Sequence, residues 1–182
     1  MSIDPGIHTY GPENATLSVR TCRTGAAAKA GHDLLIHVTA WRATLEVGEG
    51  ARPISVALDA DAASLRVREG KGGMQALSDD DRANIEETID SEVLKRQPIE
   101  FRSTSARIAP DGRTIAVQGE LTLVGTTRPV ALELSVDGNG SLSGRVTVKQ
   151  TEWGIKPYST LFGALKVVDE VEVAIDAGPT TD

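Results

Sequence analysis

Aromatic residues are scarce in this chain of 182 residues. Two Phe, two Trp and two Tyr make up 3% of the sequence, whereas 40% of the residues are hydrophobic. A chain of this length is long enough for one domain with a substantial core. Because rings supply much of the buried area in most cores, this core must be built from Val, Ile, Leu and Ala. We expect these smaller side chains to leave space unfilled.

The sequence also lacks a cysteine pair, a long apolar run and an excess of positive charge. A single cysteine, Cys22, excludes an internal disulfide. No run of about 18 apolar residues is present to span a bilayer. The 26 acidic and 19 basic residues give a formal net charge of −7, which argues against nucleic acid as a partner. Met1–Tyr10 contains neither a basic nor an apolar leader region, so we expect a cytoplasmic protein.

Hydrophobic and polar residues alternate along most of the chain, which is typical of half-buried β-strands. The predicted strands cover residues 17–22, 34–47, 54–58 with an extension to 67, 99–101, 115–123, 130–136, 142–148 and 167–175. Within 34–47 the apolar residues change parity near Trp41, which predicts a β-bulge there. Turn residues at 110–112 and 137–140 separate strands of the second half.

One segment departs from this alternation. Ser78 is a typical helix N-cap, and the three aspartates that follow it favour the first turn of a helix. Ile85, Ile89 and Val93 recur every fourth residue and form a narrow apolar stripe. Pro98 is expected to stop the helix. The segment therefore predicts one amphipathic helix between the third and fourth strands.

These elements predict an all-β fold, an eight-stranded antiparallel barrel with one inserted helix. The domain is single, with a core over about 8–176 and a short tail over 177–182. Closing eight strands into a barrel removes exposed edges, and a barrel of this size is either filled or holds one small ligand. A sandwich of two sheets is the alternative.

Few residues suggest catalysis or metal binding. A Gly-x-Ser-x-Gly motif is absent, and no nucleophile arrangement is evident. His32 and His37 are five residues apart, so they face opposite sides of a single strand. No catalytic residues, metal or cofactor are therefore predicted. Cys22 lies on the face opposite Leu17, where a thiol is either unreactive or able to link two chains of a homodimer.

Two groups of residues are candidates for the entrance of the barrel. His32 and Asp33 precede a strand and either orient a ligand head group or simply cap the strand end. Trp153, Tyr158 and Phe162 include half of the aromatic residues. This second group forms either a lid at the entrance or a plug at one end of the barrel.

One stretch of the sequence resembles a known family. Residues 119–130 read Gly-Glu-Leu-Thr-Leu-Val-Gly-Thr-Thr-Arg-Pro-Val, with supporting matches at 99–104 and 169–173. This run resembles the YceI-like family. The resemblance implies a lipocalin-like, eight-stranded antiparallel barrel that binds a polyprenyl chain or the tail of an isoprenoid quinone, and it implies no catalytic residues. Many members of that family are periplasmic, whereas the first ten residues of this chain predict a cytoplasmic protein.

The main hypothesis is a carrier for an apolar, isoprenoid-type lipid. The candidate cavity-lining residues are Leu17, Val19, Ile36, Val38, Val56, Leu58, Phe101, Leu121, Val130, Leu132, Val146 and Val171. One alternative is a non-catalytic stress or interaction protein with a filled barrel, which would meet a partner through the Ile85–Ile89–Val93 stripe. The other is an enzyme acting on an apolar substrate, for which His32, Asp33 and Arg42 are the candidates.

Overall fold

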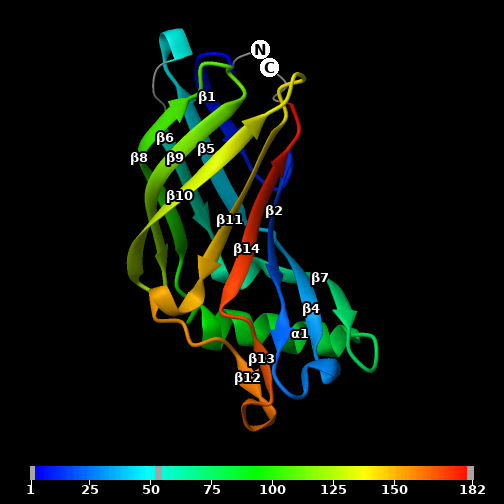
Figure 1. The fold of residues 1–182 in the computed structure, drawn as a ribbon. Helices are drawn as coiled ribbons and strands as arrows, with labels where there is room; N and C mark the ends of the chain where they lie inside the picture. Colours follow the sequence, from blue (N-terminus) through cyan, green and yellow to red (C-terminus); the bar gives the residue numbers. More distant parts are fainter. Residues whose placement is uncertain (1–2, 52–54, 180–182) are drawn as a thin grey trace.

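The structure is a computed structural model that describes residues 3–51 and 55–179 (Figure 1). Its main sheet has eleven antiparallel strands in the order β1-β5-β6-β8-β9-β10-β11-β14-β2-β4-β7. The strands of this sheet are β1 (Gly6–Tyr10), β2 (Ala15–Thr21), β4 (His32–Val38), β5 (Trp41–Val47), β6 (Ser55–Ala60), β7 (Leu65–Gly72), β8 (Ile99–Ile108), β9 (Thr114–Leu123), β10 (Thr126–Val136), β11 (Leu142–Lys149) and β14 (Glu170–Ala177).

A second, small sheet lies at one end of the molecule (Figure 1). It has the strand order β12-β13-β3, with β3 at Arg23–Thr24, β12 at Ser159–Thr160 and β13 at Leu165–Val167. Short 3₁₀ turns connect the strands at η1 (Ala28–Ala30), η2 (Glu49–Ala51), η3 (Ala62–Ser64), η5 (Gln150–Trp153) and η6 (Leu161–Gly163).

For the main sheet the predicted count of eight strands is wrong, because two predicted strands are each divided in two and one strand was missed. The predicted strand over 34–47 is divided into β4 and β5 at Thr39–Ala40, and the strand over 54–67 is divided into β6 and β7 by η3. The parity change near Trp41 therefore marks a bend between two strands and not a bulge. The additional strand is β1.

The two bends are joined by backbone hydrogen bonds. The Thr39 N–H donates to the Ser64 carbonyl at 2.9 Å, and the Asp61 N–H donates to the Ala40 carbonyl at 3.0 Å. One long bent hairpin thus contributes β5 and β6 near one end of the strand order and β4 and β7 at the other. Its bend curls the sheet into a half-barrel (Figure 1).

The interior is tightly packed at one end and looser at the other. Along β10, Leu134 and Val136 are buried, whereas Val130 and Leu132 are only half-buried although they share the same face. On β9, Ile115 and Val117 are fully buried, with an exposed fraction of 1% each. The packed end lies near the termini, and the looser end faces α1.

The single α-helix, α1 (Asp79–Thr88), continues into a π-helical turn at Ile89–Val93. It lies between β7 and β8, where the helix was predicted. A capping box confirms Ser78 as the N-cap, since its hydroxyl accepts from the Asp81 N–H while the Asp81 carboxylate accepts from the Ser78 N–H. Figure 1 shows α1 lying across one end of the main sheet.

The apolar stripe of the helix faces the protein's own core. Ile85, Ile89 and Val93 are half-buried and pack against the buried cluster inside the sheet. The stripe is therefore not free to serve as the predicted contact with a partner protein. Leu94 follows the stripe and is itself buried.

The main sheet begins and ends close to the two ends of the chain. β1 begins at Gly6, ahead of the predicted start near His8, and β14 ends at the buried Ala177. Ile54, predicted as part of the third strand, and residues 180–182 of the predicted tail lie outside the described residues.

Gly119 should be required for the packing of the curled sheet. A Cβ atom at this position would lie 2.5 Å from Cζ of Phe101 and 2.5 Å from the carbonyl oxygen of Arg102. We expect Gly119→Ala to lower the free energy of unfolding by about 1–3 kcal/mol, because the ring and the strand must shift. Chemical denaturation measures the change.

Gly138→Ala is the matched control for this experiment. No atom lies within 4 Å of the Cβ that it would add, so its effect should stay within about 0.5 kcal/mol. Equal effects of the two substitutions would contradict the proposed role of Gly119.

Candidate functional site

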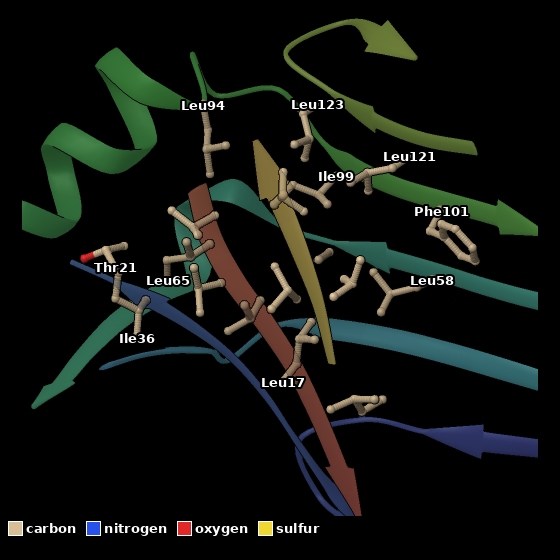
Figure 2. Close-up of a pocket in the computed structure, with 18 of the residues that line it drawn as sticks. Leu17, Thr21, Ile36, Leu58, Leu65, Leu94, Ile99, Phe101, Leu121 and Leu123 are labelled. Carbon is tan, nitrogen blue, oxygen red and sulfur yellow. The ribbon is translucent and has the colours of Figure 1, made fainter. Parts of the chain in front are cut away.

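A cavity of about 470 Å³ lies inside the curled sheet (Figure 2). Its lining comes from all eleven strands of the main sheet, from β13 and from the helical segment. The lining includes all twelve residues for which the sequence predicted this position: Leu17, Val19, Ile36, Val38, Val56, Leu58, Phe101, Leu121, Val130, Leu132, Val146 and Val171. Figure 2 shows Leu17, Leu58 and Phe101 around the common space.

The space exists because the inward side chains of three strands are too short to meet those opposite. Val130 on β10, Val146 on β11 and Val171 on β14 face the interior, yet each is only half-buried. Exposure of an inward side chain means that it faces open volume. The shortage of aromatic residues is therefore matched by open volume inside the sheet. A role of the twelve lining residues in ligand binding remains a prediction.

Several lining residues were missed by sequence reasoning. Tyr10 lies on the short strand β1, where no alternation was visible. Ile85, Ile89 and Val93 close the cavity from the helix. Their spacing was the available signal, but an apolar helix stripe indicates burial without indicating which surface it covers.

Among the described residues, the cavity lining contains no aspartate, glutamate, histidine, lysine or cysteine. Arg145 is its one charged residue; the side chain is exposed, and its Nη1 lies 3.9 Å from Oδ1 of Asp176. Burial raises the pKa of the Tyr10 phenol, so this hydroxyl stays neutral at physiological pH. The interior is thus uncharged as well as apolar.

Several polar residues of the lining lie at the end near α1. Thr21 ends β2, Asn84 and Thr88 belong to α1, and Tyr158 precedes β12. Asn84 and Tyr158 line the cavity and are also exposed to solvent. We therefore place the mouth of the cavity between α1 and the small sheet, at the lower end of Figure 1.

His32 and Asp33 do not line the cavity. The His32 ring is hydrogen-bonded through Nε2 to the Gln75 carbonyl at 2.7 Å, and Oδ1 of Asp33 accepts the Arg23 N–H at 2.9 Å. Arg23 in turn donates from Nη1 to the carbonyls of Gly31 and Lys71. These contacts join β3, β4 and the end of β7. In the structure, His32 and Asp33 therefore stabilise the end of a strand and do not face the cavity.

The three aromatic residues predicted to act together are separated. Trp153 is buried, and its indole N–H donates to the Leu121 carbonyl at 2.8 Å, so it packs in the protein without lining the cavity. Tyr158 stands at the mouth, with an exposed fraction of 43%. Phe162 is fully exposed. The three residues therefore do not form one group, and of the three only Tyr158 lines the cavity.

Arg42, nominated for the enzyme hypothesis, is also outside the cavity. It is exposed on β5 between the inward residues Trp41 and Ala43. The cavity therefore holds none of the three polar residues proposed for catalysis. Cys22 is exposed, as its position opposite Leu17 predicted.

The turn η5 is anchored to the start of β14 near the mouth. Thr151 donates to the Asp169 carboxylate from its hydroxyl at 2.6 Å and from its N–H at 2.8 Å. The hydrogen bond from the hydroxyl is the larger cause that holds the pKa of Asp169 below its ordinary value of 3.8, and the bond from the N–H adds to it. Gln150 extends the anchor by donating from its side chain to the Val168 carbonyl.

Within residues 3–51 and 55–179, no group of three or more histidine, cysteine, aspartate or glutamate side chains is arranged to hold a metal ion. In the same part of the chain, no helix has the length and apolar character needed to cross a membrane.

The fold and the cavity define the class of protein, an all-β protein whose curled antiparallel sheet surrounds an uncharged apolar cavity. The family model of the YceI-like domain matches residues 14–178. The chain belongs to the YceI-like family, a family of proteins that bind apolar ligands. The resemblance noted at residues 119–130 is thereby confirmed.

Solved structures share this fold at low sequence identity. BcnA of Burkholderia cenocepacia is 16% identical with a TM-score of 0.65, and the match covers 91% of this chain and 96% of BcnA. A YCEI protein of Campylobacter jejuni is 11% identical with a TM-score of 0.57, over 81% of this chain and 84% of that protein. No curated protein sequence matches the chain.

Thr151→Val tests the anchor of η5. Without the hydroxyl donor, we expect the pKa of Asp169 to rise towards 3.8, and a carboxylate titration followed by NMR measures the change. A depressed pKa stabilises the folded state at pH values above the ordinary one, and this stabilisation is lost as the pH falls through the depressed value. The variant should therefore be less stable at neutral pH and lose its difference from the native protein in acid.

Thr147→Val is the control, because Thr147 is exposed on β11 and has no hydrogen bond to Asp169. An unchanged Asp169 pKa in Thr151→Val would show that the hydroxyl does not set it.

Proposed function

We propose that this protein binds and carries an apolar isoprenoid-type lipid, a polyprenyl chain or the tail of an isoprenoid quinone, inside the cavity. The observation that carries the proposal is an uncharged space of about 470 Å³ lined by aliphatic side chains. This volume lies within the range of small-molecule sites. Burial of apolar surface, worth about 25 cal/mol per Å² before the entropic cost of binding, would supply the affinity.

The chemistry of the lining supports a binding role over catalysis. General acid–base catalysis mostly uses histidine, a carboxylate, lysine or cysteine within reach of the substrate. The described lining offers none of these, and its titratable groups are the phenols of Tyr10 and Tyr158 and the exposed Arg145. The filled-barrel alternative lacks similar support, since a filled interior leaves no volume of this size and the helix stripe faces inwards.

The cavity volume limits how much of a ligand is enclosed. A cavity of about 150 Å³ accommodates one benzene molecule, so 470 Å³ corresponds to about twenty carbon atoms, or about four isoprene units on this scale. A longer tail would extend through the mouth past Tyr158. The head group would then remain among the polar residues near α1.

Val130→Phe is expected to block the cavity. Val130 lines the hollow end of β10, and the added ring would occupy volume that the ligand needs. We expect lipid in the organic extract of purified protein to fall by about tenfold or more, since a steric clash of this kind costs at least about 1.4 kcal/mol. Mass spectrometry of the extract measures the loss.

Ala131→Phe is the matched control, because Ala131 is the next residue on β10 and faces outwards. It adds the same kind of ring to the outer face and should leave the lipid content unchanged. If the native protein neither copurifies with a stoichiometric lipid nor takes up an added prenyl quinone, the carrier function is wrong.

A series of prenyl quinones with increasing tail length provides an independent test. Each isoprene unit that enters the cavity buries apolar surface, so affinity should rise steeply with the first units. Beyond about four units the added tail leaves the cavity, and the gain per unit should fall. Displacement of a fluorescent fatty probe measures the affinities. A constant gain up to the longest tails would contradict the volume argument.

A further inference from the structure

We propose that the loop following β12 docks on an anionic lipid bilayer and brings the mouth of the cavity to the membrane surface. The docking tip consists of residues 158–166, which include β12, the turn η6 and the start of β13. This inference goes beyond the proposed carrier function, because it assigns a partner to an outer surface and requires no particular ligand in the cavity.

The docking tip concentrates exposed apolar side chains. Within the described residues, the large hydrophobic side chains exposed to solvent are Ile7, Met74, Tyr158, Leu161 and Phe162. The last three belong to the tip. Leu161 has an exposed fraction of 53%, and Phe162 is exposed throughout. Adjacent exposed Leu and Phe side chains are costly in water and fit the boundary between head groups and acyl chains.

The backbone holds these two side chains outwards. Leu161, Phe162 and Gly163 have φ values of 51°, 54° and 84°, in the left-handed region that bulky residues rarely adopt. The Ala164 N–H donates to the Leu161 carbonyl at 3.1 Å and closes the turn. Pairing of β12 with β13 and of β13 with β3 supports its base. In this turn both apolar side chains are exposed to solvent.

The charge around the tip is opposite to that of the chain as a whole. Residues 23–33 and 155–168 form the small sheet and its flanking turns. They carry four basic residues, Arg23, Lys29, Lys156 and Lys166, against the single acid Asp33. This local excess of positive charge contrasts with the formal net charge of −7. Basic residues beside an apolar tip complement the phosphates of anionic lipids.

A bilayer fits this surface better than a second protein does. A stable protein interface buries about 1,200 Å² or more, which three side chains on one turn cannot supply. Membrane docking needs only the insertion of the apolar tip and attraction of the nearby cations. In Figure 1 the loop after β12 extends beyond α1, so the acidic first turn of α1 is set back from the surface that the tip would touch.

Docking at this tip would place the mouth against the membrane. Tyr158 lies at the base of the tip and lines the cavity, as does Val167 immediately after it. A lipid would therefore pass between bilayer and cavity without crossing a stretch of water. The packed end of the sheet, with the termini, would point away from the membrane (Figure 1).

Vesicle co-sedimentation of the full chain tests the proposal. The vesicles contain phosphatidylcholine with about one quarter phosphatidylglycerol, or phosphatidylcholine alone, in about 0.1 M salt. The double variant Leu161→Asn, Phe162→Asn removes the apolar side chains but suits the left-handed backbone. We expect its partition onto anionic vesicles to fall at least about tenfold. Lys156→Gln with Lys166→Gln should weaken binding to the anionic vesicles alone, and high salt should abolish that difference.

Ile7→Asn is the matched control, because Ile7 is also an exposed apolar residue. It belongs to β1, which lies at the opposite end of the molecule from the tip (Figure 1). It should bind vesicles like the native protein. Unchanged thermal unfolding of the double variant establishes that it is folded. Retention of lipid in its organic extract separates a docking defect from a defect of the cavity.

Two results would overturn the proposal. One is equal partition of the native protein and the double variant, including the case in which neither binds vesicles. The other is a dimer, detected by light scattering, that the double variant dissociates while vesicle binding stays the same. That outcome would assign the tip to a second copy of this chain.

Discussion

The structure depends on the pairing of two bends within one long hairpin. Two backbone hydrogen bonds, from Thr39 to Ser64 and from Asp61 to Ala40, keep the β5–β6 ladder in line with the β4–β7 ladder while the chain changes direction. The same hairpin thereby contributes strands at one end of the strand order and next to β1 at the other. The sheet must curl to accommodate this hairpin, and the curled sheet encloses the interior of the protein.

The size of the inward side chains then determines which part of the interior is filled and which part stays open. At one end Ile115 and Val117 fill the interior, and at the other the valines of β10, β11 and β14 leave a cavity. Curvature alone does not require open space, since close packing is the usual state of a protein interior. The cavity is a property of these particular side chains, and their lack of charge is the basis for the apolar ligand proposed above.

Alternation in the sequence was sufficient to predict the β class, the position of the helix and twelve residues that line the cavity. It was insufficient where the outcome depends on distant contacts. The parity change near Trp41 is compatible with a bulge or a bend, and only pairing with residues 61–64 distinguishes them. Gly6–Tyr10 is short and exposes Ile7, so β1 lacked an alternating signal. The separation of Trp153 from Phe162 depends on a left-handed turn that the sequence around Leu161 does not announce.

The packed end of the sheet determines the orientation in which a ligand enters the cavity. Ile115 and Val117 fill the interior at one end, and the mouth described above lies at the other, so a ligand that enters through this mouth leaves in the reverse order. An amphiphile would enter with its tail leading and would always present its polar end to the outside. On the proposed carrier function, a protein that receives the lipid would therefore contact the head group before the tail, and selection among lipids would take place at the mouth rather than in the interior.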